Sequence, residues 1–159
     1  MTRYLDASAL AKRYSRERGS SAVRRLLATG RAATSRLSEV EVASALVRRE
    51  REGALTIRQR DRGLARLRAD AAALIVVELT PEVTATAKQL LLRHHLRASD
   101  AIQLASALYL HRELDVEVPF VAFDDRLVDA ARGEGLTVER VRSPSRRRTA
   151  SRERNDTSL

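Results

Sequence analysis

Short apolar runs alternate with longer helical segments along this chain, and this alternation limits the folds that it can adopt. The clearest run, Leu74 to Leu79, is rich in β-branched residues and predicts a buried strand. Thr80-Pro81-Glu82 follows at once and predicts a helix start, with a capping residue, a proline at the first helical position and an acid. Strands that alternate with helices favour an α/β fold, in which a largely parallel sheet is sandwiched between helices.

The same patterns predict the other elements, and the 159 residues fit one domain. Strands are expected over residues 3–6, 32–35, 74–79 and 120–123, with a last edge strand over 136–138. Helices are expected over residues 7–14, 21–27, 38–53, 56–69, 81–95, from 99 past 108, and over 124–132.

The composition indicates which core this chain builds. Hydrophobic residues make up 43% of the chain but aromatic residues only 3%, so we expect a core of Leu, Val, Ile and Ala. Such a core suits a parallel sheet covered by alanine-rich helices. The chain has no cysteine, which excludes a disulfide scaffold and a thiolate metal or redox site.

Nothing in the sequence predicts an exported or membrane-spanning protein. Arg3 and Asp6 interrupt the N-terminus before an apolar run develops, so no signal peptide is expected. The apolar stretches fall far short of the roughly 20 residues that span a bilayer. The lack of cysteine is compatible with a reducing cytoplasm, and we expect a cytoplasmic protein without membrane contact.

The chain is basic, with a formal net charge of +9. Residues 140–159 contribute +5, from seven arginines against Glu153 and Asp156, which leaves +4 for residues 1–139. A basic body favours a polyanionic partner such as a nucleic acid, although GC-rich coding would also enrich arginine. From residue 143 onward the apolar pattern stops, so we expect a folded domain over 1–142 and a disordered basic tail over 143–159. The tail is either an electrostatic arm for RNA or an unselected flexible end.

Four acids stand at the ends of predicted elements, and each has an ordinary structural explanation. Asp6 and Asp124 suit the capping position of the helix that follows them. Ser38-x-x-Glu41 matches the capping box, in which the acid reaches back to the serine amide. Asp100 lies in a first helical turn, where a negative charge favours the helix dipole.

Considered together, the same acids predict a site. Asp6 and Asp124 directly follow strands, and in an open α/β sheet sites form at the carboxyl ends of the strands. Glu41 and Asp100 stand in first turns of helices that can start from the same edge, so all four side chains can point into one cleft. A divalent cation would offset their repulsion, and oxygen ligands favour Mg²⁺ or Mn²⁺ over zinc.

Such a cleft on a basic protein suggests phosphodiester hydrolysis. The metal would lower the pKa of a bound water and neutralise charge on the scissile phosphate. Arginine side chains around the cleft would hold the flanking phosphates.

Four stretches of the chain closely resemble the PIN-domain family, and within it the VapC-type toxins of bacterial type II toxin–antitoxin pairs. A fifth, shorter segment closes the pattern, and the resemblance extends from the start of the chain to about Val141. The stretches are Tyr4-Leu-Asp-Ala-Ser-Ala-Leu10, Ser38-Glu-Val-Glu-Val-Ala-Ser-Ala-Leu46, Leu96-Arg-Ala-Ser-Asp-Ala-Ile-Gln-Leu-Ala105, Val121-Ala-Phe-Asp-Asp-Arg-Leu127 and Gly135-Leu-Thr-Val138.

The resemblance implies a three-layer α/β/α sandwich and a magnesium-dependent endoribonuclease. It also implies a toxin dimer and a cognate VapB-type antitoxin whose C-terminal segment occupies the cleft. By position, Asp6 and Asp100 correspond to the principal metal ligands, Glu41 to the helix acid and Asp124 to the fourth acid. Ser8 keeps its family place and is expected to orient Asp6 or the attacking water.

Three positions qualify this assignment. Glu39 lies close to Glu41, but only Glu41 is followed by Val-x-Ser-Ala-Leu. Asp125 adjoins Asp124 and is able to share its role. Ala122 stands where many relatives have Thr or Ser, which removes a hydroxyl near the site.

Other readings of the sequence remain open or are excluded. The chain lacks the second aspartate of a dehalogenase-type phosphatase, the paired acids and late lysine of a receiver domain, and the glycine-rich turn of a dinucleotide-binding domain. Two alternatives to a toxin remain: a PIN nuclease for housekeeping RNA processing, and a non-catalytic nucleic-acid-binding module with this fold.

Overall fold

The computed structural model describes residues 1–141, so the predicted tail over 143–159 lies outside the described residues. Four strands form one parallel sheet in the order β3-β2-β1-β4. The strands are β1 (Thr2–Leu5), β2 (Arg31–Ser35), β3 (Ile75–Val77) and β4 (Phe120–Val121). The predicted α/β class with a mainly parallel sheet is therefore confirmed.

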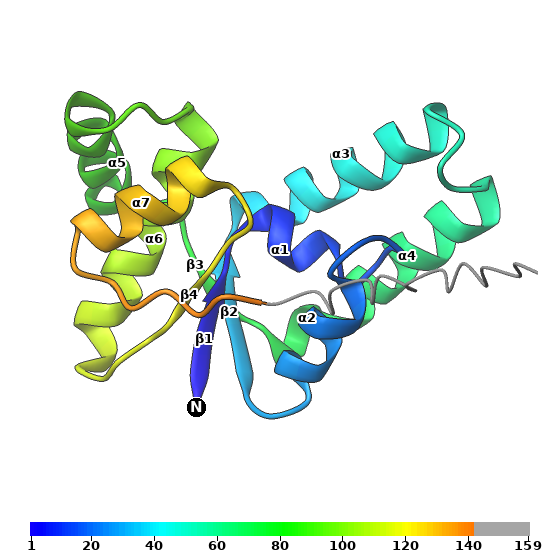
Figure 1. Cartoon of the computed structure of the whole chain (residues 1–159), viewed down its shortest axis with the longest axis horizontal. Coiled ribbons are helices and arrows are strands. Elements are labelled where there is room, and N and C mark those ends of the chain that lie inside the picture. The colour runs from blue at the N-terminus through cyan, green and yellow to red at the C-terminus, as the bar shows by residue number, and fades with distance from the viewer. Residues whose placement is uncertain (142–159) are drawn as a thin grey trace, which may run out of the picture.

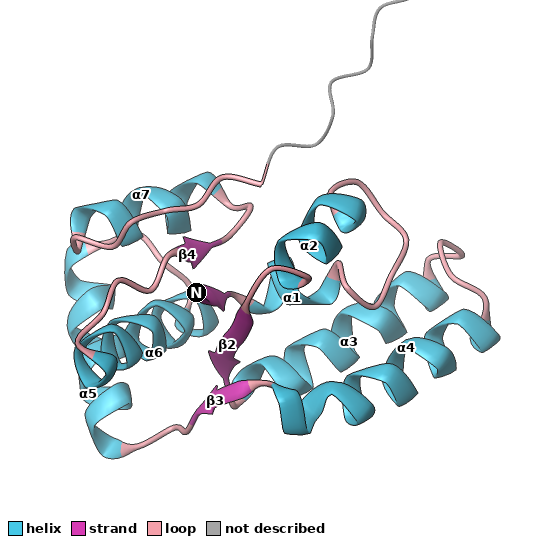
Figure 2. Cartoon of the chain, turned by 90° about the horizontal axis from the view of Figure 1, so that it is seen from below, coloured by secondary structure: helices cyan, strands magenta, loops and turns pink. Residues whose placement is uncertain are grey.

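Helices cover both faces of this sheet and give the predicted three layers. The helices α1, α2, α3 and α4 lie on one side, and α5, α6 and α7 lie on the other (Figure 1). The antiparallel pair α3 and α4 extends away from the sheet (Figure 2). The bounds are α1 (Ala7–Ala11), α2 (Ser20–Leu27), α3 (Leu37–Arg51), α4 (Ile57–Asp70), α5 (Pro81–Arg93), α6 (Ala98–Leu114) and α7 (Asp125–Gly133).

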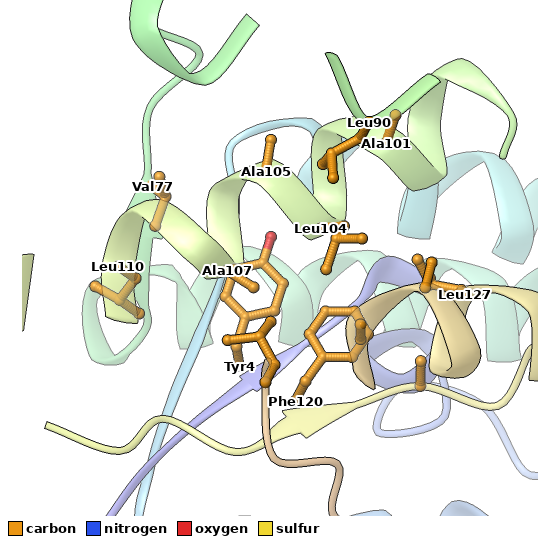
Figure 3. Packing of buried hydrophobic residues seen from close by; sticks show 14 of the residues in the cluster. Tyr4, Val77, Leu90, Ala101, Leu104, Ala105, Ala107, Leu110, Phe120 and Leu127 are labelled. Carbon is orange, nitrogen blue, oxygen red and sulfur yellow. The ribbon is translucent and has the colours of Figure 1, made fainter. Parts of the chain in front are cut away.

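Each layer of helices packs on its own hydrophobic core, because successive strand residues point to opposite faces of a sheet. Tyr4 and Phe120 enter the core beneath α5, α6 and α7, where their rings stack with centroids 5.7 Å apart (Figure 3). The next residues along each strand, Leu5 and Val121, enter the core beneath α1, α3 and α4. The cores consist mainly of Leu, Val and Ala, as the composition predicted.

The predicted edge strand over residues 136–138 is reduced to a single bridge in the described part of the chain. Val138 pairs with Phe120, and two backbone hydrogen bonds flank that pair. Since β4 is only two residues long, it offers too short a partner for a longer ladder.

The carboxyl ends of three strands deliver the chain to the edge where a site was predicted. Asp6 follows β1 and starts α1, and Asp124 follows β4 and starts α7. The helix α3 begins just after β2, with Arg36 at its capping position. The fold therefore places three helix starts along one edge of the sheet.

Candidate functional site

Asp6 is a buried carboxylate at the carboxyl end of β1. Its side chain is 5% exposed and caps α1, because Oδ1 accepts a hydrogen bond of 2.8 Å from the Ala9 backbone N–H. The Ser8 hydroxyl donates to Oδ2 at 2.8 Å. Ser8 thus orients Asp6, as its position in the sequence predicted.

The burial of Asp6 makes its ionisation unfavourable. Burial raises the pKa of the Asp6 carboxyl from 3.8 to about 6, although the hydrogen bonds from Ala9 and Ser8 favour the charged form. The negative charge of Asp100 raises this pKa further. Asp100 stands in the first turn of α6, where Oδ2 accepts a hydrogen bond of 3.3 Å from the Arg97 backbone N–H. The structure thus brings Asp6 and Asp100 within electrostatic reach of each other.

Glu41 reaches the same region from α3. Its Oε2 accepts a hydrogen bond of 2.7 Å from the side-chain amide of Gln103 in α6. Burial raises the pKa of the Tyr4 hydroxyl well above its usual value, and the charges of Asp6 and Glu41 raise it further. Both carboxylates therefore act electrostatically on the buried hydroxyl of Tyr4.

Gln103 is a site residue that the sequence analysis did not single out. Its Oε1 accepts a hydrogen bond from the Tyr4 hydroxyl at 2.9 Å, and its Nε2 donates to Ser38 Oγ at 2.8 Å as well as to Glu41. The side chain is 2% exposed. The signal available in the sequence was a long polar side chain inside the apolar run of α6.

The capping box considered for Ser38 and Glu41 does not form. The helix α3 begins at Leu37, so Ser38 lies inside the helix, and its hydroxyl is 2.6 Å from that of Thr34. Since the Thr34 hydroxyl donates to the Leu5 carbonyl, Ser38 is left to donate to Thr34. Glu41 is thereby free to face Gln103.

The contacts of Asp124 differ from those of the other three acids. Its Oδ1 caps α7 by accepting from the backbone N–H groups of Arg126 at 2.9 Å and Leu127 at 3.1 Å. The Leu127 N–H and the nearby Arg126 charge hold the pKa of this exposed carboxyl below its usual value. Asp125 is exposed at the first position of the same helix.

Glu39, the neighbour of Glu41 in the sequence, makes different contacts. It is exposed and pairs with Arg36 at 3.4 Å, and Arg36 also holds Glu78. Glu41 instead lines a cavity of about 360 Å³ together with Ser8, Val40, Ser44, Arg48 and two alanines. Of the residues that line this cavity, Glu41 is an acid and Arg48 is a cation.

The acids do not form a closed metal cage in the described residues. Within residues 1–141, no three Asp, Glu, His or Cys side chains are close enough together to hold a metal ion as they stand. The charges of Asp6 and Glu41 act on Tyr4, and the charge of Asp100 acts on Asp6, whereas Asp124 caps α7 and pairs with the Arg126 side chain at 3.6 Å. The side chains of the site offer carboxylate, hydroxyl and amide oxygens as metal ligands. Oxygen ligands are the type that hard divalent cations prefer.

No helix within residues 1–141 is both long and apolar enough to cross a bilayer.

Several solved structures are similar to this chain in fold. A toxin–antitoxin complex from Klebsiella pneumoniae is 17% identical with a TM-score of 0.55, over 78% of this chain and 88% of that one. The sarcin–ricin-loop-cleaving toxin VapC20 of Mycobacterium tuberculosis is 21% identical with a TM-score of 0.61, over 82% and 95%. FitAcB from Neisseria gonorrhoeae is 14% identical with a TM-score of 0.57, over 87% and 96%.

Sequence comparison with curated proteins gives no significant match. A family model described as PIN domain, in contrast, matches residues 3–133, which include all four predicted site acids. Since this match covers most of the chain and the fold agrees with it, the protein belongs to the PIN domain family.

Proposed function

We propose that this protein is a Mg²⁺-dependent endoribonuclease that acts as the toxin of a VapBC-type toxin–antitoxin pair. The observation that carries the proposal is the buried Asp6 carboxylate at the carboxyl end of β1. Its pKa is raised to about 6, Asp100 lies within electrostatic reach, and Gln103 holds Glu41 through a hydrogen bond. A fold has little reason to keep such carboxylates together unless a cation offsets their repulsion.

The acids fit a hard cation by their chemistry. Asp6, Asp100 and Glu41 would hold Mg²⁺, or Mn²⁺ in its place, and Asp124 would complete the set from α7. The ion, when bound, supplies a water of lowered pKa and neutralises charge on the scissile phosphate.

The protein's own residues prepare this site. Asp6 becomes a full carboxylate as the pH rises through about 6, and the Ser8 hydroxyl fixes its Oδ2. Gln103 fixes Glu41 through a hydrogen bond of 2.7 Å. Arg48, in the wall of the cavity beside Glu41, is placed to bind a phosphate that flanks the scissile bond. These groups bind and orient, which is the main part of phosphoryl-transfer catalysis.

The toxin assignment draws on the structural relatives, two of which are described as a toxin–antitoxin complex and as a toxin that cleaves the sarcin–ricin loop. By analogy we propose an RNA substrate, a VapB-type antitoxin as partner, a homodimer and a cytoplasmic location. Exposed apolar side chains near α5 offer a surface for a second copy, since Leu92 is 81% exposed and Leu79 and Leu91 are also exposed.

Cleavage of defined RNAs by the purified full chain, with Mg²⁺ and with EDTA, tests the enzymatic part. We expect cleavage with Mg²⁺, none with EDTA, and none from Asp6→Asn or Asp100→Asn at unchanged circular dichroism. Asp129→Asn is the matched control, because Asp129 is an exposed acid of α7 outside the site, and it should cut like the parent. Equal cleavage by Asp100→Asn and the parent, with contaminating nuclease excluded, would overturn the site.

Growth and gene context test the toxin part separately. Expression of the parent should arrest growth, Asp6→Asn should not, and a small gene beside the toxin gene should restore growth when co-expressed. Cleavage without growth arrest and without such a gene would favour housekeeping RNA processing. RNA binding without metal-dependent cleavage would favour a non-catalytic module.

A further inference from the structure

A second polar cavity lies among α2, α4 and the turn after α1, and none of the four acids lines it. It has a volume of about 330 Å³, and five arginines line it with Tyr14. The arginines are Arg13, Arg16, Arg24, Arg62 and Arg66. No acid is among its lining residues in the described part of the chain. The helices α2 and α4 lie on the opposite side of the sheet from α6 and α7 (Figure 1). Asp100 stands in the first turn of α6, and Asp124 caps α7.

The sequence brings these arginines together in two steps. Arg62 and Arg66 are four residues apart in α4, so they lie on one face of that helix. Gly63 stands between them, and a Cβ added there would lie 3.0 Å from the Tyr14 carbonyl oxygen. The missing side chain lets the turn after α1 approach α4 closely, and this turn carries Arg13 and Arg16.

The positive charge in this cavity is largely uncompensated. Arg13 pairs with Asp70 at 2.6 Å and holds the pKa of that carboxyl below its usual value. Within residues 1–141, the other four arginines have no carboxylate within 4.0 Å of their guanidinium groups. Cations gathered in a cavity repel one another, and an anion bound among them removes that repulsion.

We propose that this arginine cavity binds phosphate groups, and that an RNA backbone supplies them. Guanidinium groups match phosphate oxygens in bidentate geometry, and the cavity volume is that of a site for a small polar group. The RNA source rests on the proposed function, since a ribonuclease must hold its substrate beyond the scissile bond. The cavity would thus be an anchoring site distinct from the acids that do the chemistry.

Fluorescence anisotropy of the full chain with a labelled single-stranded RNA, in EDTA, tests this without requiring cleavage. The test variant carries Arg24→Gln and Arg66→Gln, one cavity arginine from α2 and one from α4. The control carries Arg25→Gln and Arg68→Gln, which are exposed arginines of the same helices outside the cavity lining. Both variants lose the same net charge.

We expect the cavity variant to bind RNA about tenfold more weakly, with a salt dependence reduced by about 1.4 in the log–log slope, as for two lost phosphate contacts on a single strand. The control should stay within about a factor of two of the parent. Equal losses in the two variants would overturn the proposal, because net charge alone would then explain binding. Circular dichroism and melting temperature establish that both variants fold.

Inorganic tripolyphosphate distinguishes the two sources of phosphate. Binding of tripolyphosphate to the parent, its loss in the cavity variant and unchanged RNA affinity would keep the phosphate site and assign it to a free small anion. If the cavity variant and the control bound RNA with equal affinity and tripolyphosphate with equal affinity, the proposed site would be overturned. Since all measurements are made without Mg²⁺, RNA binding at the cavity can succeed even where cleavage fails, so the two proposals fail separately.

Discussion

The side-chain amide of Gln103 donates a hydrogen bond of 2.7 Å to Oε2 of Glu41, from α6 across to α3. The same amide donates to Ser38, and its carbonyl accepts from the Tyr4 hydroxyl, so one buried side chain joins β1, α3 and α6. Glu41 is therefore held by a residue that two further hydrogen bonds, with Tyr4 and Ser38, keep in place. This arrangement makes Gln103 a positioning residue for the acid site.

Replacing Gln103 with Met keeps the volume but removes the amide. We expect a loss of about 1–3 kcal/mol in the free energy of unfolding, because Tyr4 and Ser38 each lose a buried hydrogen-bond partner. We also expect kcat for RNA cleavage to fall more than KM rises, since Glu41 would be present but no longer oriented. Denaturant titration and steady-state kinetics measure the two effects.

The matched control is Gln89→Met, the same chemical change at an exposed position of α5. It should leave both stability and cleavage close to those of the parent. A normal kcat in Gln103→Met, together with lowered stability, would mean that Gln103 has a structural role only.

Most of the fold could be predicted from local signals in the sequence. The start of α5 followed from Thr80 and Pro81, and the Thr80 hydroxyl does accept from the Val83 N–H. The prediction of an edge strand over 136–138 was wrong, because a strand needs a partner to pair with and β4 is too short to provide one. Local propensity therefore located the elements, while partner length decided which of them became strands.

The places of the four acids at strand ends and helix starts could be predicted from the sequence, but their side-chain contacts could not. Asp6 and Asp124 follow strands, so the topology of parallel sheets indicated where they would lie. Gln103 was not predicted, because its role depends on contacts of α6 with α3 and β1. Gln103 is 62 positions away from Glu41 in the sequence and 99 positions away from Tyr4. The arginine cavity likewise depends on Gly63. The need for glycine there follows from the close approach of α4 to the turn after α1, which the sequence alone does not show.

Asp6→Asn is expected to stabilise the metal-free protein at neutral pH while it abolishes cleavage. The folded-state pKa of Asp6 is raised to about 6, so its contribution to stability is fully present below its unfolded pKa and is lost as the pH rises through about 6. Asn avoids the buried charge and can still accept from the Ala9 N–H as a cap. We expect a gain of about 1–3 kcal/mol at pH 7.5 in EDTA.

The pH dependence of that gain is its internal control. At pH 4, Asp6 of the folded parent is largely protonated, while the unfolded carboxyl, with its ordinary pKa of 3.8, is only about half ionised, so the difference in unfolding free energy between parent and variant should shrink to about half a kcal/mol. Urea titrations at the two pH values measure this difference. An equal or smaller gain at pH 7.5 than at pH 4 would contradict a destabilising buried charge at this position.

Glu134→Gln is expected to loosen α7 from α5. Glu134 accepts from Arg93 through both carboxylate oxygens and contacts His94 at 2.7 Å, and these two side chains, Arg93 first, hold the pKa of Glu134 below its usual value. Its stabilising contribution is present above its unfolded pKa and is lost as the pH falls through the lower folded pKa. Because Arg93 is half exposed, we expect a cost of only about 0.5–1 kcal/mol at pH 7.

The cost of Glu134→Gln should disappear in acid, where the parent carboxylate is also neutral. Asp129→Asn provides the comparison on the same helix, since Asp129 is 76% exposed and its nearest cation, Arg132, is 3.6 Å away. Its effect on the melting temperature should be within error of zero. An equal effect of the two substitutions would show that the α5–α7 ion pair contributes nothing specific.

Gly63→Ala should destabilise the protein even though alanine is the better helix former. A Cβ at this position would meet the Tyr14 carbonyl oxygen and a methyl group of Leu46, each at 3.0 Å. The helix preference favours alanine by about 1 kcal/mol, whereas forcing the turn after α1 away from α4 costs about 1–3 kcal/mol, so the net effect should be a loss of stability. Gly133→Ala is the control, because its Cβ meets only a ring carbon of His94 at 3.4 Å, an ordinary contact, and it should be neutral or stabilising. A raised melting temperature in Gly63→Ala would show that the turn moves away from α4 at no cost, and would contradict the close packing that draws Arg13 and Arg16 towards Arg62 and Arg66.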